Sequence, residues 1–595
     1  MSTPPLSSGP EGPHALRPLL EIVLDALETG TRARGGPLPA GGPDAVAARM
    51  REAVGEVLPA QGDPHALRTL VHAVTEGAAD PAHPLCTAHL HCPPLALATA
   101  ADLAASALNP SLDSWDQGPG ASELEALVTK ALASEIYGAG KPDGTGAPHP
   151  HRELRTGGEL CTGGEPCTDS EPCTGGELRP PRELRSADAR PGAGEPGRAG
   201  ASSVAGEFHA GGELRSGGAW VGVGESGGTG APPRAGGVGG AGELRSGGAW
   251  VGAGESGGTG APRSATAPRP PEPPGSLITT GGTESNQLAL LLAREACGGA
   301  VRLVCGANAH HSLARAAWLL GLPEPVRVPT PAGTLDPGAL DETLTRLPGP
   351  LLVAATAGTT DAGLIDPLPE IAARCAAHGA RLHIDAAYGG GLLFSDRHRA
   401  RLTGLDTADT ITLDLHKLGW QPVATGLLAV KDTRDLTALG QRADYLNADD
   451  DTDAGLPDLL GRSLRTTRRP DVLKLAVTLK TLGRSGLGAL VDQVCATARE
   501  FAALVDGHPG FDLYAHPVIS TVLFRPAGAA DHTVAAVRRA LLTDGRAVLG
   551  RARPDGRLWL KATLLNPTTG PDDLTALLHL VAAGHATLVE GHTPR

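Results

Sequence analysis

The feature that most restricts the possible folds is an alternation of strand-like and helix-like segments between residues 275 and 430. Short apolar runs such as "VRLVCG", "GPLLVAAT" and "TITLDL" are separated by amphipathic stretches such as "TESNQLALLLAREA" and "LPEIAARCAAHG". Strands that alternate with helices of this length form βαβ units, in which parallel strands are covered by helices. We therefore expect an α/β fold with a mostly parallel central sheet.

Segments of other types flank this region. Residues 14–30, 93–111 and 121–138 carry apolar residues at helical spacing, and Gly30 is the expected end of the first helix. After about residue 435, helical segments are followed by "HPVISTVLFRP" and "LWLKATLLNP". These segments indicate a smaller α/β domain at the C-terminal end.

The composition changes sharply between about residues 139 and 273, where Gly, Pro, Ala, Glu and Arg dominate. The segment "GELRSGGAWVGVGESGGTGAP" at 212–232 recurs almost unchanged at 242–262. Such a segment buries too little apolar surface to offset the entropy of an ordered chain, so we predict a disordered, repeat-expanded insertion. The predicted division is an N-terminal helical segment (1–138), the insertion (139–273), a large domain (274–434) and a small C-terminal domain (435–595).

Charge and cysteine content exclude several classes of function. The formal net charge of −14 makes a nucleic acid or an anionic membrane a poor partner, and no apolar stretch reaches the length of a membrane span. The N-terminus lacks the features of a signal peptide, and nine cysteines in so long a chain do not form a secreted disulfide framework. Cys161, Cys167 and Cys173 are spaced too widely for a zinc site, so no metal is expected. We expect a cytoplasmic protein.

A glycine turn joins the first predicted strand to a helix in "SLITTGGTESNQLALLL". Thr283 lies where a helix N-cap belongs, and Gly281 and Gly282 allow the backbone to approach a ligand closely. The helix N-terminus that follows attracts an anion such as phosphate. Taken alone, such a turn is more often a simple connection between a strand and a helix than a ligand site.

Further polar residues follow four other predicted strands. Asp385 ends "RLHID", and Lys417 follows the next strand, 32 residues later. The pair suits pyridoxal phosphate, because a lysine can bond to the cofactor aldehyde while an aspartate keeps the pyridine nitrogen protonated. His310 or His311 could cover the ring. A further strand is followed by the hydroxyls of Thr356, Thr359 and Thr360. Four of the strand ends offer, in chain order, a phosphate turn, a stacking imidazole, a carboxylate and a lysine, and together these four groups predict a pyridoxal-phosphate site.

These motifs resemble the group II pyridoxal-phosphate-dependent amino-acid decarboxylases. The resemblance covers about residues 14–138 and 275–590, and it rests on "TTGGTESNQLALLLAR", "AGTTDAGLIDPL", "LHIDAAYGG", "ADTITLDLHK", "RSLRTTRRPDVLKL" and "LKATLLNP". It implies the aspartate-aminotransferase fold (fold type I). It also implies a small amino-acid substrate and an obligate homodimer with its sites at the subunit interface.

The resemblance also implies roles for individual residues. Lys417 would bond to the cofactor, Asp385 would pair with the pyridine nitrogen, and His310 would stack on the ring and assist protonation. His311 lies where the family varies. Further cofactor contacts are implied at Gly282, Thr283, Thr360, Ala387 and His416.

Within the family, "HLHCPPL", "LNPSLDSWDQGP" and "LHKLGWQP" resemble the branch that includes L-2,4-diaminobutyrate decarboxylases and the lysine decarboxylases of siderophore pathways. We therefore expect decarboxylation of 2,4-diaminobutyrate, lysine or ornithine to an amine and carbon dioxide. A distal ammonium needs a carboxylate partner, and Asp113 and Asp116 are the candidates. The alternative is that these two aspartates cap the turn after Pro110.

The sequence departs from the family pattern in two places, and three alternative functions stand beside the proposed one. The insertion replaces a short connection, and residues 448–462 lack the catalytic Tyr that the aromatic branch places there, although Tyr445 is nearby. The alternatives are an aromatic-L-amino-acid decarboxylase, an aminotransferase of the same fold, and a non-catalytic assembly protein that acts through its repeats. The presence together of His310, Asp385 and Lys417 argues against the last.

Overall fold

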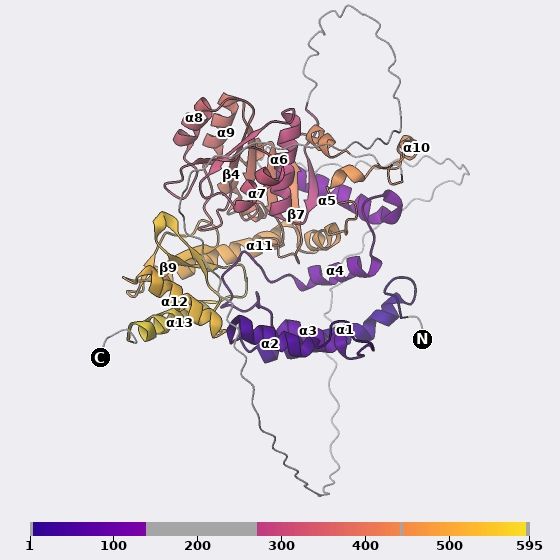
Figure 1. Cartoon of the computed structure of the whole chain (residues 1–595). Coiled ribbons are helices and arrows are strands. Elements are labelled where there is room, and N and C mark those ends of the chain that lie inside the picture. The colour runs from indigo at the N-terminus through magenta and orange to yellow at the C-terminus, as the bar shows by residue number, and fades with distance from the viewer. Residues whose placement is uncertain (1–3, 139–270, 441–442, 444, 591–595) are drawn as a thin grey trace, which may run out of the picture. The chain divides into compact units, whose positions relative to one another are not determined.

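The computed structural model describes residues 4–138, 271–440, 443 and 445–590 (Figure 1). A seven-stranded sheet has the order β1-β7-β6-β5-β4-β2-β3. All its pairs are parallel except those of β7, which runs antiparallel to both β1 and β6. The strands are β1 (Gly275–Thr279), β2 (Arg302–Gly306), β3 (Val326–Val328), β4 (Leu351–Thr356), β5 (Arg381–Asp385), β6 (Thr410–Asp414) and β7 (Gly426–Val430). The expected mostly parallel sheet is confirmed.

Helices cover both faces of this sheet. On one face, Leu290 and Leu313 of α6 (Gly282–Ala296) and α7 (His311–Leu319) pack against Leu303 and Leu352. The neighbouring residues of the same strands face the opposite side, as the period of two along a strand requires. That side is covered by α5 (Pro119–Gly138), α8 (Pro337–Arg346), α9 (Leu368–His378) and α11 (Val472–Asp506).

The N-terminal segment is helical, as predicted, but its first helix does not end at Gly30. Helix α1 (Gly12–Arg34) continues through Gly30 and ends before Gly35, whose φ of 70° suits a glycine. A side chain at Gly30 would place its Cβ 2.7 Å from the carbonyl oxygen of His72, so this glycine allows two helices to pack closely. The other N-terminal helices are α2 (Gly42–Val54), α3 (Ala66–Glu76) and α4 (Ala96–Leu108).

A second, antiparallel sheet of order β10-β11-β9-β8 lies in the C-terminal part of the chain. The Tyr388 hydroxyl, on the loop after β5, contacts the hydroxyls of Ser520 (2.9 Å) and Thr521 (3.0 Å) and so connects the two sheets. None of the described helices is both long and apolar enough to cross a membrane. The remaining elements are α10 (Asp449–Asp453), β8 (Phe511–Leu513), β9 (Thr521–Pro526), α12 (Asp531–Thr543), β10 (Gly550–Ala552), β11 (Trp559–Thr563) and α13 (Pro571–Glu590).

The predicted insertion lies outside the described residues, apart from its last three. The described chain stops at Gly138 and resumes at Pro271, and each of these residues lines a cavity that Asp409 and Lys431 also line. Asp409 directly precedes β6, whereas Lys417 lies beyond the other end of that strand. The chain therefore leaves and re-enters the described structure at the edge of the sheet opposite Lys417.

Candidate active site

A cavity of about 310 Å³ lies at the carboxyl ends of the parallel strands, where open α/β sheets bind their ligands. The structure brings together there all eight residues that the resemblance implied for the cofactor. They are Gly282, Thr283, His310, Thr360, Asp385, Ala387, His416 and Lys417. The hydroxyl-bearing Thr356 also lines the cavity, whereas Thr359 does not.

The glycine turn after β1 leaves room at the start of α6. A Cβ on Gly282 would lie 3.1 Å from both the Cβ of Ala387 and Oδ2 of Asp414, and one on Gly281 would lie 3.0 Å from Cε1 of His416. Gly281 has a φ of 150°, which glycine adopts without strain. The helix N-terminus is thus open to the cavity, which suits an anion.

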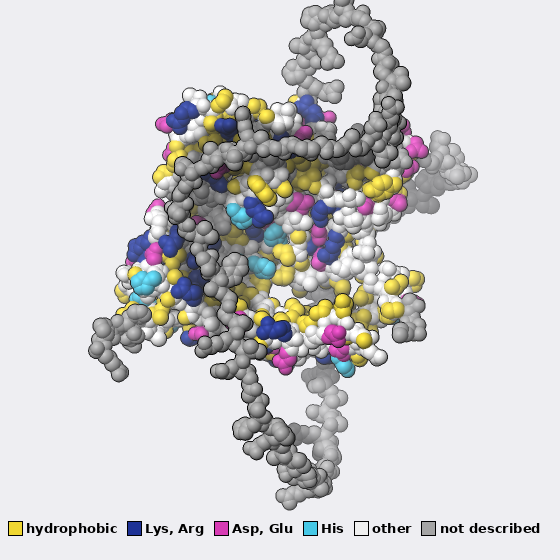
Figure 2. Space-filling model, viewed as in Figure 1, with side chains coloured by type: hydrophobic (Ala, Val, Ile, Leu, Met, Phe, Trp, Pro, Cys, Tyr) yellow, Lys and Arg dark blue, Asp and Glu magenta, His cyan; other side chains and the backbone are white. Residues whose placement is uncertain are grey.

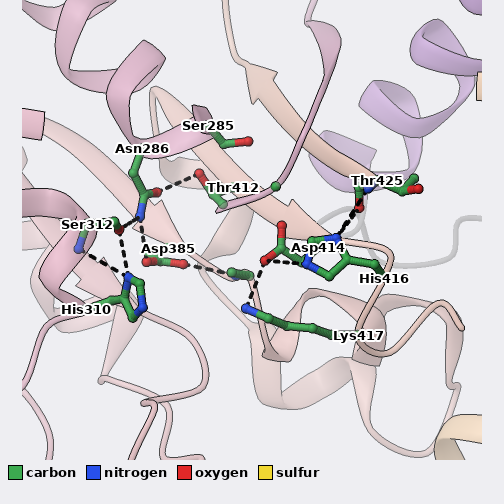
Figure 3. Close-up of polar contacts among 12 residues, drawn as sticks. Ser285, Asn286, His310, Ser312, Asp385, Thr412, Asp414, His416, Lys417 and Thr425 are labelled. Carbon is green, nitrogen blue, oxygen red and sulfur yellow. Dashed lines mark hydrogen bonds and ion pairs between the residues drawn. The ribbon is translucent and has the colours of Figure 1, made fainter. Parts of the chain in front are cut away.

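Asp385 is held by two hydrogen bonds at the end of β5. The backbone N–H of Ala387 donates to Oδ1 (3.1 Å), and the Asn286 amide donates to Oδ2 (2.9 Å; Figure 3). The Asn286 oxygen in turn accepts from Thr412 Oγ1 (2.9 Å) and His383 Nε2 (3.0 Å). Because an amide oxygen can only accept, Asn286 is fixed in the orientation that directs its N–H at Asp385.

His383 is completely buried behind this network, and burial lowers its pKa to about 4 despite the opposing charge of Asp385. It is therefore neutral near pH 7, with the proton on Nε2 because that nitrogen donates to Asn286. The other nitrogen, Nδ1, then accepts from the Thr410 hydroxyl at 2.9 Å. A neutral histidine thus supports the asparagine that holds Asp385.

His310 caps the N-terminus of α7 and belongs to the same network. Its Nδ1 lies 2.8 Å from Ser312 Oγ and accepts from the Ser312 backbone N–H, and Ser312 Oγ accepts from Asn286 (2.9 Å). Burial is the main cause of the lowered pKa of His310. The neutral ring carries its proton on Nε2, the nitrogen that these bonds leave free.

Lys417 lies beside a carboxylate that the sequence analysis did not identify. Its Nζ is 2.8 Å from Oδ2 of Asp414, three residues earlier at the end of β6, and His416 Nε2 is 3.6 Å from the same oxygen (Figure 3). His416 Nδ1 lies 3.0 Å from the carbonyl oxygen of Thr425. Burial lowers the pKa of His416 and outweighs the opposite effect of Asp414.

Asp113 and Asp116 do not line this cavity. Asp113 accepts from Gln117 Nε2 (2.8 Å) and Asp116 accepts from Ser114 Oγ (2.6 Å), which are local contacts of the kind that stabilise a turn. Asp116 lines a separate cavity with Tyr445, whose side chain is largely exposed. These contacts are compatible with turn capping, the alternative given for these two aspartates.

The sequence analysis did not identify several residues of the site, among them Asn286 and Asp414. Asn286 interrupts the apolar face of α6, one turn after Thr283, and a polar residue on such a face is a signal of a buried contact. Asp414 is the last residue of β6, which is buried throughout, and Asp385 is the last residue of β5. Burying a carboxylate without a partner costs free energy, so Asp414 carried the same signal as Asp385.

The donor set fits a phosphorylated pyridine aldehyde. The open N-terminus of α6 suits the phosphate, and the fixed carboxylate of Asp385 suits a protonated ring nitrogen. The His310 ring offers a flat surface, and Lys417 offers the amine. The buried Oδ1 of Asp414, which has no hydrogen-bond partner among the described residues, marks polar capacity that the protein alone does not satisfy.

Comparison with known families and proteins agrees with this arrangement. Residues 265–527 match the "Pyridoxal-dependent decarboxylase conserved domain". The chain is 42% identical over 320 residues to L-2,4-diaminobutyrate decarboxylase of Rhizobium meliloti (strain 1021), covering 51% of this chain and 64% of that protein. It is 33% identical over 344 residues to the Acinetobacter baumannii enzyme of the same name, covering 52% and 68%. The aligned region thus spans about two thirds of either relative.

Solved structures share the fold over nearly the whole chain. The glutamate decarboxylase domain of diaminobutyrate-pyruvate transaminase and L-2,4-diaminobutyrate decarboxylase from Vibrio parahaemolyticus matches with a TM-score of 0.67 at 24% identity, covering 98% of both chains. Oryza sativa TDC, solved with PLP and tryptamine, matches with a TM-score of 0.68 at 19% identity, covering 98% of this chain and 99% of that one. At these identities the likeness bears on the fold, and it confirms the expected fold type I architecture.

Proposed function

The chain belongs to the pyridoxal-dependent decarboxylase family, and from that premise we propose that it removes the α-carboxylate of a small L-amino acid with pyridoxal 5'-phosphate as cofactor. The observation that carries this proposal is the convergence on one cavity of the α6 N-terminus, His310, Asp385 and Lys417. Each of these groups matches one part of the cofactor: the phosphate, the ring face, the ring nitrogen and the aldehyde.

When bound, the cofactor supplies an electron sink for the electron pair that remains when carbon dioxide leaves. Asp385 would hold the ring nitrogen protonated, and Asn286 and Ala387 keep its carboxylate oriented for this. Lys417 would hold the aldehyde and would give up that position to the amine of the substrate. His310, neutral and protonated on Nε2, would cover the ring and would assist protonation of the α-carbon.

We propose a diamino acid as the substrate: 2,4-diaminobutyrate, ornithine or lysine. Both relatives described above are named for L-2,4-diaminobutyrate. The cavity itself contains two carboxylates, Asp385 and Asp414, so its charge favours a substrate that carries an additional cation. Asp113 and Asp116 remain candidates for reading the distal ammonium from a neighbouring subunit.

We also propose that the chain forms a homodimer in the cytoplasm. Apolar side chains are exposed along α1 and α3, and Figure 2 shows hydrophobic groups on the surface in this part of the molecule. Contiguous exposed apolar surface favours association with a partner. Leu24 is 64% exposed, Leu27 43% and Val74 57%. The six cysteines in the described ranges are free thiols, which suits a reducing compartment.

The test is incubation of the purified protein with pyridoxal phosphate and a panel of diamino, aromatic and acidic L-amino acids, with carbon dioxide and amine both measured. We expect stoichiometric carbon dioxide and amine from a diamino acid, with no requirement for a keto acid. Turnover that needs a keto acid would instead identify an aminotransferase. Release of carbon dioxide from aromatic substrates alone would overturn the proposed substrate class.

A further inference from the structure

Glu284, in the first turn of α6, closes the glycine turn that precedes this helix. Its Oε2 accepts hydrogen bonds from the Thr280 backbone N–H (2.6 Å) and from Thr280 Oγ1 (2.7 Å). A glutamate near a helix N-terminus that reaches back to a preceding N–H fixes the way the chain enters the helix. Thr280 lines the cavity, whereas Glu284 does not. Glu284 therefore acts on the cavity through Thr280.

The carboxylate of Glu284 also brings a negative charge close to the place expected for the phosphate. Gly282 and Thr283, the two residues before it, line the cavity at the open N-terminus of α6. A negative charge in the first turn stabilises a helix, but it repels a phosphate bound at the same N-terminus. A phosphate site beside Glu284 therefore needs a cation that offsets this charge.

Arg465 brings such a cation from a distant part of the chain. Its Nε lies 3.4 Å from Glu284 Oε1, and the two side chains are 34% and 13% exposed, respectively. This Nε is buried and has no hydrogen-bond partner among the described residues, so the contact with Glu284 is an ion pair. Because both side chains are partly removed from water, salt screens the pair less than it screens fully exposed charges.

We propose that Glu284 and Arg465 are a pair of positioning residues for the cofactor phosphate. Glu284 holds Thr280 at the entry to α6, and Arg465 offsets the charge that Glu284 would otherwise present to the phosphate. This inference rests on the cofactor site of the proposed function, and it is independent of the substrate's side chain. It adds two residues that act on the phosphate from outside the cavity.

Two other roles compete with this one. The ion pair could serve only to hold the segment before α11 against α6, because Arg465 and Leu464 line a separate cavity together with Leu291 of α6. Glu284 could serve only to cap the helix. Both roles concern the stability of the folded chain, and neither distinguishes a ligand that carries a phosphate from one that does not.

The test compares pyridoxal 5'-phosphate with pyridoxal, which lacks the phosphate. Each is titrated into full-length apoprotein while its absorbance is recorded. Both aldehydes meet Lys417 in the same way, so the ratio of the two dissociation constants isolates the phosphate. In Arg465→Ala the charge of Glu284 is no longer offset, and we expect the affinity for pyridoxal phosphate to fall about three- to tenfold. The affinity for pyridoxal should change less than about twofold, because it has no phosphate to repel.

Removal of the opposing charge should reverse this loss. In the Arg465→Ala/Glu284→Gln double variant both charges are absent, and the glutamine oxygen can still accept a hydrogen bond from Thr280. We expect this variant to bind pyridoxal phosphate within about twofold of wild type. Glu284→Gln alone should bind it at least as tightly as wild type, since the repelling charge is gone. This single variant also tests the proposal if Arg465→Ala does not fold.

A matched control and a change of salt separate this local effect from a general loss of positive charge. Arg462 is exposed on the same segment and forms no ion pair with any residue that the structure describes. Arg462→Ala should therefore change the affinity for pyridoxal phosphate less than about twofold. The loss in Arg465→Ala should shrink in about 1 M salt, where the Debye length is about 3 Å.

Three results would overturn the proposal. Equal losses of pyridoxal phosphate and pyridoxal in Arg465→Ala would assign the pair to the fold alone. An unchanged affinity for pyridoxal phosphate in that variant would show that the phosphate does not respond to the pair. A double variant that binds as weakly as Arg465→Ala would show that Arg465 does not offset the charge of Glu284. If wild type binds pyridoxal phosphate and the ratios change as expected, but no amino acid releases carbon dioxide, the proposed function fails and this assignment stands.

Discussion

Replacing Asn286 with alanine should destabilise the protein and impair the use of Asp385 in the same variant. Asn286 is 1% exposed and makes four hydrogen bonds, to Asp385, Ser312, Thr412 and His383. Three of these bonds join neutral groups, worth about 1 kcal/mol each, and the bond to the carboxylate is worth about 2 kcal/mol. Water entering the vacated space recovers part of the sum, so the expected loss is about 3 to 5 kcal/mol.

The assay is the thermal midpoint of unfolding, together with the pH dependence of cofactor absorbance. For a folded part of this size, a loss of about 4 kcal/mol lowers the midpoint by roughly 4 to 8 °C. Asp385 also loses one of the two donors that orient its carboxylate, so the absorbance of the bound cofactor and its dependence on pH should differ from those of wild type.

Asn308→Ala is the matched control, because Asn308 donates one bond to the Gly333 carbonyl and does not line the cavity. It should shift the midpoint by no more than about 2 °C and leave the spectrum unchanged. A midpoint for Asn286→Ala as high as that of the control would refute the reasoning about the network. A lowered midpoint with a wild-type spectrum would show that Asn286 supports the fold without acting through Asp385.

Three further predictions concern other parts of the chain. The folded-state pKa of His383 is lowered to about 4 from 6.5, so the stability linked to its neutral form is present above pH 6.5 and is lost as the pH falls toward 4. His383→Gln should flatten the thermal midpoint over that range, and an unchanged slope would assign the loss to other groups. Lys417→Ala should fold but no longer retain the cofactor after borohydride reduction, and surviving label would mean that another lysine is the attachment site. Deletion of residues 141–273 with a short flexible linker should preserve turnover, and a hundredfold loss in an intact dimer would show that the insertion contributes to the site.

The alternation of strands and helices could be predicted because each buried strand is a short apolar run and each helix carries apolar residues at helical spacing. Strand β3 (Val326–Val328) was missed because three residues are too few to form a pattern. The position of β7 between β1 and β6 was also not readable, because strand order depends on contacts between residues far apart in the chain. Gly30 was misjudged for a related reason: its role is set by a neighbouring helix.

The sequence indicated the site residues that stand at the ends of predicted strands. It did not indicate the residues that hold those groups in place by hydrogen bonds or an ion pair. Lys417, Asp385 and His310 follow apolar runs directly, so their common location at one edge of a sheet could be inferred. Asn286 acts from within a helix, and its contacts with residues on β5 and β6 appear only when the helix is packed on the sheet. The spacing of Asp414 to Lys417 was visible, but the ion pair depends on the local turn after β6.

The location of Gly138 and Pro271 bears on how the gene can change. Both residues lie beside Asp409 and Lys431, at the edge of the sheet opposite Lys417. A stretch of chain that leaves and returns there can grow or shrink without displacing any strand that carries the cavity. Tandem copies, which replication slippage readily adds or removes, are therefore under little selection from the chemistry at such a position. We expect related chains to differ in copy number between these two points, while the spacing from Gly275 to Lys417 stays constant.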